Sequence, residues 1–275
     1  MRKPSWNHRK KTLWAVTGML LFLILVVAGG MLCAQKALVS DFSAVNCPPG
    51  KNHLFGTDWL GRDMFSRTLR GLSISVLLGV GTAFASAGIA LVLGILAAVN
   101  KWMDVVVSYL VDLVMGIPHI LLLVLISLAV GRGLKGVVIG VMVTHWPSLA
   151  RVIRGEILQL KEQPYIATAR MLGKSSWRIA LRHMLPNVLS QFLTGMLLLF
   201  PHAVLHESSI TFLGFGLSAE QPAIGIILSE SMKYLILGNW WLAVFPGTFL
   251  VVIVLMFQYM GESLKRFFDP ASIHR

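Results

Sequence analysis

Long apolar runs alternate with shorter polar stretches along the whole chain. The apolar runs are about twenty residues long, which is the length that an α-helix needs to cross a hydrocarbon core of about 30 Å. This pattern predicts an all-α, polytopic membrane protein with about six transmembrane helices. The predicted spans cover residues 13–33, 74–99, 104–130, 134–152, 188–213 and 241–262.

Basic residues gather before the first span, between the fourth and fifth, and after the sixth. Because positively charged flanks face the cytoplasm, both termini are predicted to be cytoplasmic. The predicted order is a cytoplasmic N-terminus (1–12), the first transmembrane helix (13–33), an extracytoplasmic loop (34–73), a five-helix core (74–262) that includes a cytoplasmic segment (156–187), and a cytoplasmic C-terminus (263–275).

Two local features refine this topology. Gly116 and Pro118 are expected to kink the third span, because a proline leaves a backbone carbonyl without its helical partner. The stretch from Asp63 to Leu72 has helical spacing and is predicted to lie along the membrane surface.

Composition excludes several classes of function. The chain is 56% hydrophobic and 13% charged, which is unlike a soluble domain, and its net charge of +12 comes mainly from residues that flank the spans. Membrane lipid is therefore the expected partner of the basic residues, and no nucleic acid is expected. Cys33 and Cys47 are too few for a disulfide framework or a closed zinc site, and whether they pair is left open.

A polar, basic segment, Glu156–Asn187, separates the fourth and fifth spans. Gly173 divides it into two short amphipathic pieces, and Pro186 ends it where the next apolar run begins. Such a segment at a membrane surface is suited to docking against another protein. Gly173, Lys174 and Ser175 resemble the end of a phosphate-binding loop, but Thr168 stands where a glycine is required and no strand precedes it. The chain is therefore expected to hold no nucleotide or other cofactor of its own.

Ionisable residues inside the spans are the candidates for a substrate path, since they are costly in lipid. His202, His206 and Glu207 stand together in the fifth span, and His145 lies in the fourth. Histidines four apart share one helical face, so His202 and His206 are candidate transient ligands for a cation such as nickel. The alternative, weighted about equally, is that these side chains hydrogen-bond to neighbouring helices. A zinc-protease helix would need a second histidine where Ile210 stands.

The segment Glu156–Asn187 resembles the coupling segment of bacterial ABC importer permeases, whose consensus is EAA, three residues, Gly, nine residues, then I-x-L-P. Residues 167–169 occupy the EAA positions, Gly173 the glycine and Leu185-Pro186 the final pair, although Ala167 replaces the glutamate and His183 the isoleucine. Two further stretches, Leu54–Gly71 and Ser209–Leu217, resemble signatures of the dipeptide, oligopeptide and nickel permeases.

This resemblance implies a type I ABC importer permease in the bacterial inner (cytoplasmic) membrane, and not an enzyme. The implied partners are a homologous second permease subunit, two ATPase subunits that carry ATP and Mg, and an extracytoplasmic substrate-binding protein. The implied contacts with the ATPase lie at Tyr165, Ala167, Thr168, Ala169, Arg170, Met171, Leu172, Gly173, Leu185 and Pro186.

The substrate is less sharply indicated. The spacing of His202 and His206 resembles that of the nickel-type permeases, whereas Glu207 resembles the peptide pattern. We favour nickel or a metal chelate as the predicted substrate, with di- or oligopeptides as the alternative. A stand-alone channel or secondary carrier is a weaker alternative, because a channel has no use for a docking segment.

Overall fold

The structure, a computed structural model, describes residues 6–218 and 221–268, and the predicted end segments lie partly outside this range. The described residues form helices and loops, and their only β-type pairing is an isolated bridge between Thr57 and Asp63. The helices are α1 (Trp6–Leu32), η1 (Phe42–Ala44), α2 (Met64–Val99), α3 (Lys101–Met115), α4 (His119–Val130), α5 (Leu134–Lys161), α6 (Pro164–Met171), α7 (Ser176–Ile179), the π-helical turn η2 (Ala180–Met184), α8 (Leu185–Phe212), α9 (Ile224–Leu235) and α10 (Trp241–Phe268).

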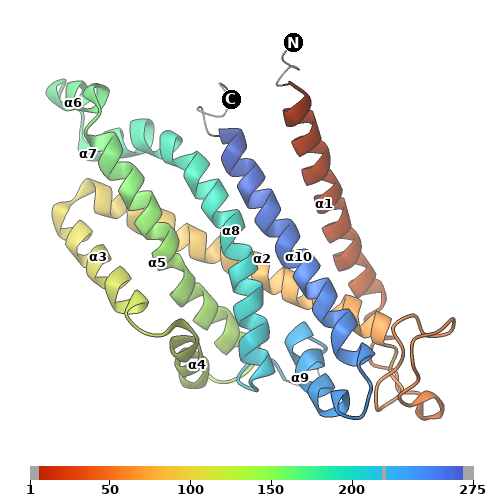
Figure 1. Ribbon diagram of the computed structural model, residues 1–275. Coiled ribbons are helices and arrows are strands. Elements are labelled where there is room, and N and C mark those ends of the chain that lie inside the picture. Colours follow the sequence, from red (N-terminus) through yellow and green to blue (C-terminus); the bar gives the residue numbers. More distant parts are fainter. Residues whose placement is uncertain (1–5, 219–220, 269–275) are drawn as a thin grey trace.

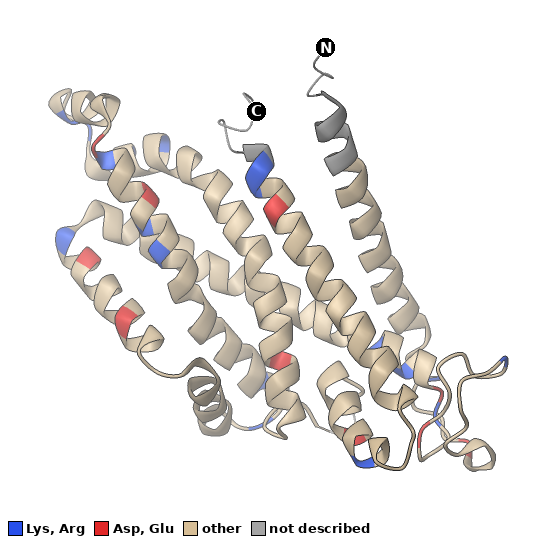
Figure 2. Ribbon diagram, viewed as in Figure 1, with Lys and Arg blue, Asp and Glu red and all other residues tan. Residues whose placement is uncertain are grey.

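The bundle has two distinct ends (Figure 1). The start of α1, the end of α10 and the α6–α7 pair lie at one end, which we call the α6 end; α4, α9 and the loop after α1 lie at the other, which we call the α9 end. Charged residues are concentrated toward these ends, and the long helices between them are mostly uncharged (Figure 2). This arrangement agrees with the predicted placement of the coupling segment on the side of both termini.

The predicted third span is broken and not merely kinked. α3 and α4 meet at an angle of 97° across the short connection that contains Gly116 and Pro118. Proline disfavours helical geometry in the residue before it and lacks a backbone donor, so the helix stops at Met115 and restarts at His119. The described chain therefore has five helices long and apolar enough to cross a membrane, or six if the bent pair counts as one span.

The stretch from Asp63 to Leu72 does not form a separate surface helix. Asp63 is the N-cap of α2, and its side chain accepts a hydrogen bond from the backbone N–H of Ser66. No helix-breaking proline follows, so the helix runs from Met64 without interruption to Val99. Met64 and Leu72 are buried within the protein. The apolar face of this stretch therefore packs against other helices and not against the membrane surface.

Two glycines let α2 pack closely against α8 and α5. A Cβ at Gly79 would lie 2.3 Å from Val204 Cγ2, and one at Gly94 would lie 2.6 Å from Ile153 Cγ2. Either position excludes a side chain unless its neighbour moves. Gly81, on the same helix, has no atom within 4 Å of an added Cβ. Gly79 and Gly94 thus mark the contacts of α2 with α8 and α5.

Candidate functional site

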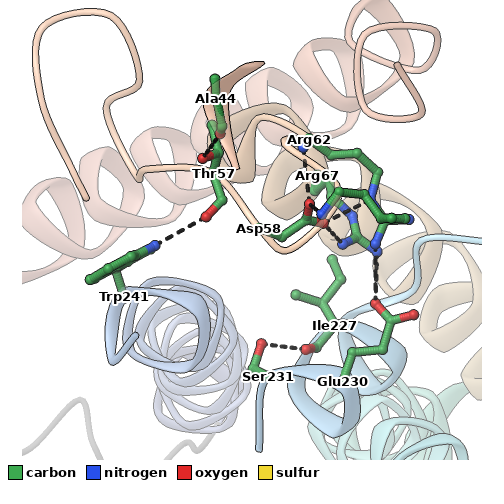
Figure 3. Close-up of polar contacts among 10 residues, drawn as sticks. Ala44, Thr57, Asp58, Arg62, Arg67, Ile227, Glu230, Ser231 and Trp241 are labelled. Atoms are coloured by element: carbon green, nitrogen blue, oxygen red, sulfur yellow. Dashed lines mark hydrogen bonds and ion pairs between the residues drawn. The ribbon is translucent and has the colours of Figure 1, made fainter. Parts of the chain in front are cut away.

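Four charged side chains at the α9 end form what we call the loop clamp: Asp58, Arg62, Arg67 and Glu230 (Figure 3). Arg67 is 1% exposed and pairs with Asp58, which is fully buried, while its Nη2 donates to Glu230 Oε2 at 2.9 Å. Arg62 Nε donates to Asp58 Oδ2 at 2.7 Å. Two positive and two negative charges therefore neutralise one another in a poorly solvated place.

The clamp joins distant parts of the chain. Asp58 and Arg62 belong to the loop after α1, Arg67 to the first turn of α2, and Glu230 to α9. The Trp59 ring stacks on Tyr234 of α9 with ring centres 4.6 Å apart, and Trp241 Nε1 donates to the Thr57 carbonyl at 3.3 Å (Figure 3). The signature Leu54–Gly71 thus fixes the loop onto α9, which is a structural role.

Asp63, beside the clamp, has a perturbed pKa. Its partial burial raises the pKa, but hydrogen bonds from the Ser66 side chain and backbone, together with His53, outweigh that effect. The net result is a pKa below the ordinary value of an aspartate. The ionised carboxylate is therefore the form that supports the start of α2.

A cavity of about 590 Å³ lies where α4, α5 and α8 meet beside the α3–α4 bend. Its walls include His119 from α4, His145 from α5, and His202 and His206 from α8. Three of these residues, which we call the histidine cluster, each offer one ring nitrogen, and these three nitrogens lie within 4.8 Å of one another. The three residues are His119, His145 and His206.

The structure brings together only some of the side chains that the sequence singled out for the substrate path. His202 lines the same cavity and is exposed, but it is not a member of the histidine cluster. Glu207 is 2% exposed and does not line the cavity. Its carboxylate accepts hydrogen bonds from Thr211 Oγ1 at 3.1 Å and Ser208 Oγ at 3.3 Å, both in the last turns of α8.

The coupling segment forms a small unit beyond the end of α5. α6 ends at Met171, and Gly173 follows it in a left-handed conformation with a φ of +72°. Lys174 N donates to Ala169 O at 3.2 Å across the turn. This is the usual way for a glycine to close a helix C-terminus. Ser175 then caps α7 by accepting from Arg178 N. The predicted division of the segment at Gly173 is confirmed.

One face of this unit is buried and the other is not. Ile166, Ala169 and Ile179 are buried, and they hold α6 and α7 against each other and the bundle. Most of the predicted contact residues are exposed, with Met171 at 80% and Leu172 at 72%. Ala169 faces inward and Leu185 is half-buried; the exposed members are Tyr165, Ala167, Thr168, Arg170, Met171, Leu172, Gly173 and Pro186.

Comparison with known proteins decides the family. Residues 90–273 match the family described as the binding-protein-dependent transport system inner membrane component. The chain belongs to this family of ABC importer permeases. As a permease subunit of an importer it is a multi-pass membrane protein and not itself an enzyme, and it works with ATPase and permease partners. The stand-alone channel or carrier receives no support.

Similar proteins carry the names of peptide permeases. The dipeptide transport system permease protein DppC of Bacillus subtilis (strain 168) is 31% identical over 272 residues, covering 98% of this chain and 85% of that protein. The oligopeptide transport system permease protein OppC of the same organism is 30% identical over 262 residues, covering 93% and 85%. These names favour the peptide alternative over our preference for nickel.

A solved structure shows the same fold. The permease matches a chain of the inward-facing MetNI methionine ABC transporter with a TM-score of 0.61 and 22% identity, covering 74% of this chain and 96% of that chain. The type I ABC importer permease fold predicted from the sequence is therefore confirmed. Cys33 and Cys47, whose pairing was left open, are both free thiols in the structure.

Sequence reasoning missed His119. It was passed over because it follows the kink proline and is distant in sequence from the other candidates. One signal was available, since a histidine inside an apolar run beside Pro118 is an ionisable group at a break in a span. Its contacts with His145 and His206 depend on the 97° bend, which the sequence predicted only as a kink.

Proposed function

We propose that this chain is the permease subunit of an ABC importer for di- or oligopeptides. The observation that carries the substrate class is similarity along almost the whole permease to two proteins named for peptide transport. The implied partners are a homologous second permease, two ATPase subunits that bind ATP and Mg, and an extracytoplasmic binding protein. The α6 end faces the cytoplasm in this proposal, in keeping with the basic residues of the coupling segment.

Uptake by intact cells tests the substrate class. Cells with and without this gene are compared for growth on di- and oligopeptides as the only source of a required amino acid. Growth that depends on the gene supports the proposal. Equal growth of both strains, with the importer present in the membrane, would contradict it.

We further propose that the coupling segment transmits the closure of the ATPase subunits. A motion can be transmitted only through an element that is both exposed to the partner and braced against the moving helices. α6 has this character, because Met171 and Leu172 are exposed while Ile166 behind them is fully buried. The turn at Gly173 fixes the angle between the two short helices.

Gly173 offers a matched pair of variants for this second proposal. An added Cβ would meet no atom within 4 Å, so only the backbone conformation opposes substitution. Gly173→Val should abolish uptake while the protein remains in the membrane, because a β-branched residue is strongly disfavoured at a φ of +72°. Gly173→Asn should retain most uptake, since asparagine tolerates this conformation.

The measurements are peptide uptake, the amount of permease in the membrane, and the amount of ATPase subunit that co-purifies with it. Normal uptake by Gly173→Val would count against the coupling role. The same variant is also expected to lower the amount of co-purified ATPase, which ties the loss to the coupling contact.

Nickel or a metal chelate remains a second candidate substrate because of one observation. Three imidazole groups converge on the cavity beside the α3–α4 bend, and imidazole is a good ligand for nickel. Uptake of labelled nickel with and without added free histidine as a chelator, in cells with and without the gene, separates the candidates. A gene-dependent, ATP-dependent signal would favour metal import, and its absence would leave the peptide assignment.

A further inference from the structure

The histidine cluster is assembled from three different helices. The ring centres of His119 and His206 are 4.3 Å apart, those of His119 and His145 are 4.7 Å apart, and those of His145 and His206 are 5.2 Å apart. These residues come from α4, α8 and α5 respectively, so no local helical spacing explains their meeting. The arrangement is a convergence of side chains in space.

Hydrogen bonding fixes which nitrogen of His145 is free. Nδ1 lies 2.9 Å from the carbonyl oxygen of Val141 and 3.1 Å from Thr144 Oγ1. Because a carbonyl only accepts, Nδ1 carries the proton and donates it, which leaves a lone pair on Nε2. His145 is 5% exposed, and its Nε2 is buried without a hydrogen-bond partner. A backbone bond of this kind is how proteins orient a metal-binding imidazole.

A second ring nitrogen of the histidine cluster also lacks a hydrogen-bond partner. Nε2 of His119 is also buried without a partner among the described residues. A buried polar atom without a hydrogen bond costs about 1–3 kcal/mol, so two of them within one cluster call for an explanation. A cation bound between the rings would engage both nitrogens, with His119 in the tautomer that leaves Nε2 unprotonated.

The surroundings do not oppose a positive charge. Besides the histidines, the residues that line the cavity are apolar or carry hydroxyl groups, and none is a lysine or arginine. Glu207, the nearest acidic residue along α8, hydrogen-bonds to Thr211 and Ser208, so no carboxylate competes for the imidazoles. Imidazole as the only strong ligand favours zinc, copper or nickel over magnesium or calcium.

We propose that His119, His145 and His206 bind a divalent transition metal ion of the nickel, copper and zinc group. Ligand nitrogens around a tetrahedral ion lie about 3.4 Å apart at metal–nitrogen distances of about 2.0–2.1 Å. Nitrogens already within 4.8 Å reach that spacing by small side-chain rotations. Three protein ligands leave a coordination position open toward the cavity, where water or a chelating group of a substrate can bind.

This inference rests on the permease function proposed above and names a ligand for its cavity. His119 starts the helix that follows the α3–α4 bend, whereas His145 and His206 lie within the long helices α5 and α8. A movement of α4 against those helices would separate the ligands. Occupancy of the site is therefore expected to depend on the position of α4.

The test measures Ni²⁺ binding by the purified, intact importer that contains the full-length permease. Equilibrium dialysis with metal analysis gives the affinity for wild type and for His119→Gln, His145→Gln and His206→Gln. His53→Gln is the control, because His53 lies in the loop after α1 and belongs neither to the cavity wall nor to the cluster. X-ray absorption of the nickel-loaded wild type reports the number of imidazole ligands.

Each cluster variant is expected to bind Ni²⁺ at least about tenfold more weakly than wild type, since loss of a ligand should cost at least as much as loss of a ligand's supporting contact. The control should bind within about twofold of wild type, and the absorption spectrum should contain three imidazoles. A variant that does not assemble is replaced by the corresponding asparagine variant.

Two results would overturn the assignment. One is a wild-type importer that binds no Ni²⁺, Zn²⁺ or Cu²⁺ at millimolar concentration. The other is binding that is equally weakened by His53→Gln, or unaffected in all the cluster variants. Neither result depends on peptide uptake, which is measured separately, so failure of the metal site and failure of the peptide proposal are distinguishable.

Discussion

The loop clamp and the histidine cluster are both polar groups buried in an apolar bundle, yet their bonding differs. In the clamp, Arg67 reaches two carboxylates and the charges balance, although Arg67 Nε and Arg62 Nη2 are themselves buried without hydrogen-bond partners. In the cluster, nitrogens of His119 and His145 are buried without hydrogen-bond partners, and no counter-charge lines the cavity. A network whose charges are paired within the chain stabilises the fold. A network left open within the chain is suited to a ligand from outside.

The largest expected effect is on the clamp. Arg67→Ala should lower the free energy of unfolding by about 3–5 kcal/mol, because it leaves the fully buried carboxylate of Asp58 without its main partner. Denaturant titration of the protein in detergent measures the change in the free energy of unfolding. Arg70→Ala, a partly exposed arginine one turn further along α2, is the control and should change stability by less than about 0.5 kcal/mol. An equal loss of stability in both variants would mean that the ion pairs of the clamp do not stabilise the fold more than an ordinary arginine does.

The histidine cluster should respond in the opposite way. His119→Leu removes a buried nitrogen that has no partner, so without metal the variant should be as stable as wild type to within about 1 kcal/mol, or more stable. Saturating Ni²⁺ should stabilise wild type by about 2.7 kcal/mol at one hundred times the dissociation constant, and the variant by at least about 1.3 kcal/mol less. Thermal unfolding with EDTA or with Ni²⁺ measures both. A loss above about 3 kcal/mol in EDTA would make His119 a structural residue like Arg67.

The smallest expected effect is a pH dependence beside the clamp. Hydrogen bonds hold the pKa of Asp63 below its ordinary value despite partial burial, so its contribution to stability is complete above the unfolded pKa of about 3.9. That contribution is lost as the pH falls through the lower, folded pKa. Asp63→Asn keeps a helix cap and removes this titration. The difference in the free energy of unfolding between wild type and variant should be constant from about pH 7 to 5 and shrink below about pH 4. Plots of this free energy against pH that stay parallel down to about pH 3 would contradict a role for the ionised carboxylate.

The sequence predicted the parts of this molecule that depend on local pattern. Apolar runs predicted the spans, and Gly173 predicted the break in the coupling segment because its turn needs a residue that tolerates positive φ. The start of α2 at Met64 was missed, because helical spacing alone does not say whether a helix faces lipid or protein.

The histidine cluster was predicted only in part. His206 was identified as a candidate, but its predicted partner was His202, the neighbour on the same helical face. The structure joins His206 to His119 and His145 through the packing of α4 and α5 against α8. That packing follows from the sharp bend at Gly116–Pro118, and the size of such a bend is set by tertiary contacts that a single sequence does not display.

The bend between α3 and α4 has a consequence for biogenesis. With 15 and 12 residues, α3 and α4 are about 22 and 18 Å long, and neither alone crosses a hydrocarbon layer of about 30 Å. The turn between them exposes backbone groups that lipid cannot satisfy, so it must face protein or a water-filled cavity. Its residues line the cavity, whose other walls come largely from α5 and α8, which are synthesised later. A nascent chain that has reached only residue 130 therefore holds an unfinished span, which the insertion machinery has to shelter until the following helices arrive.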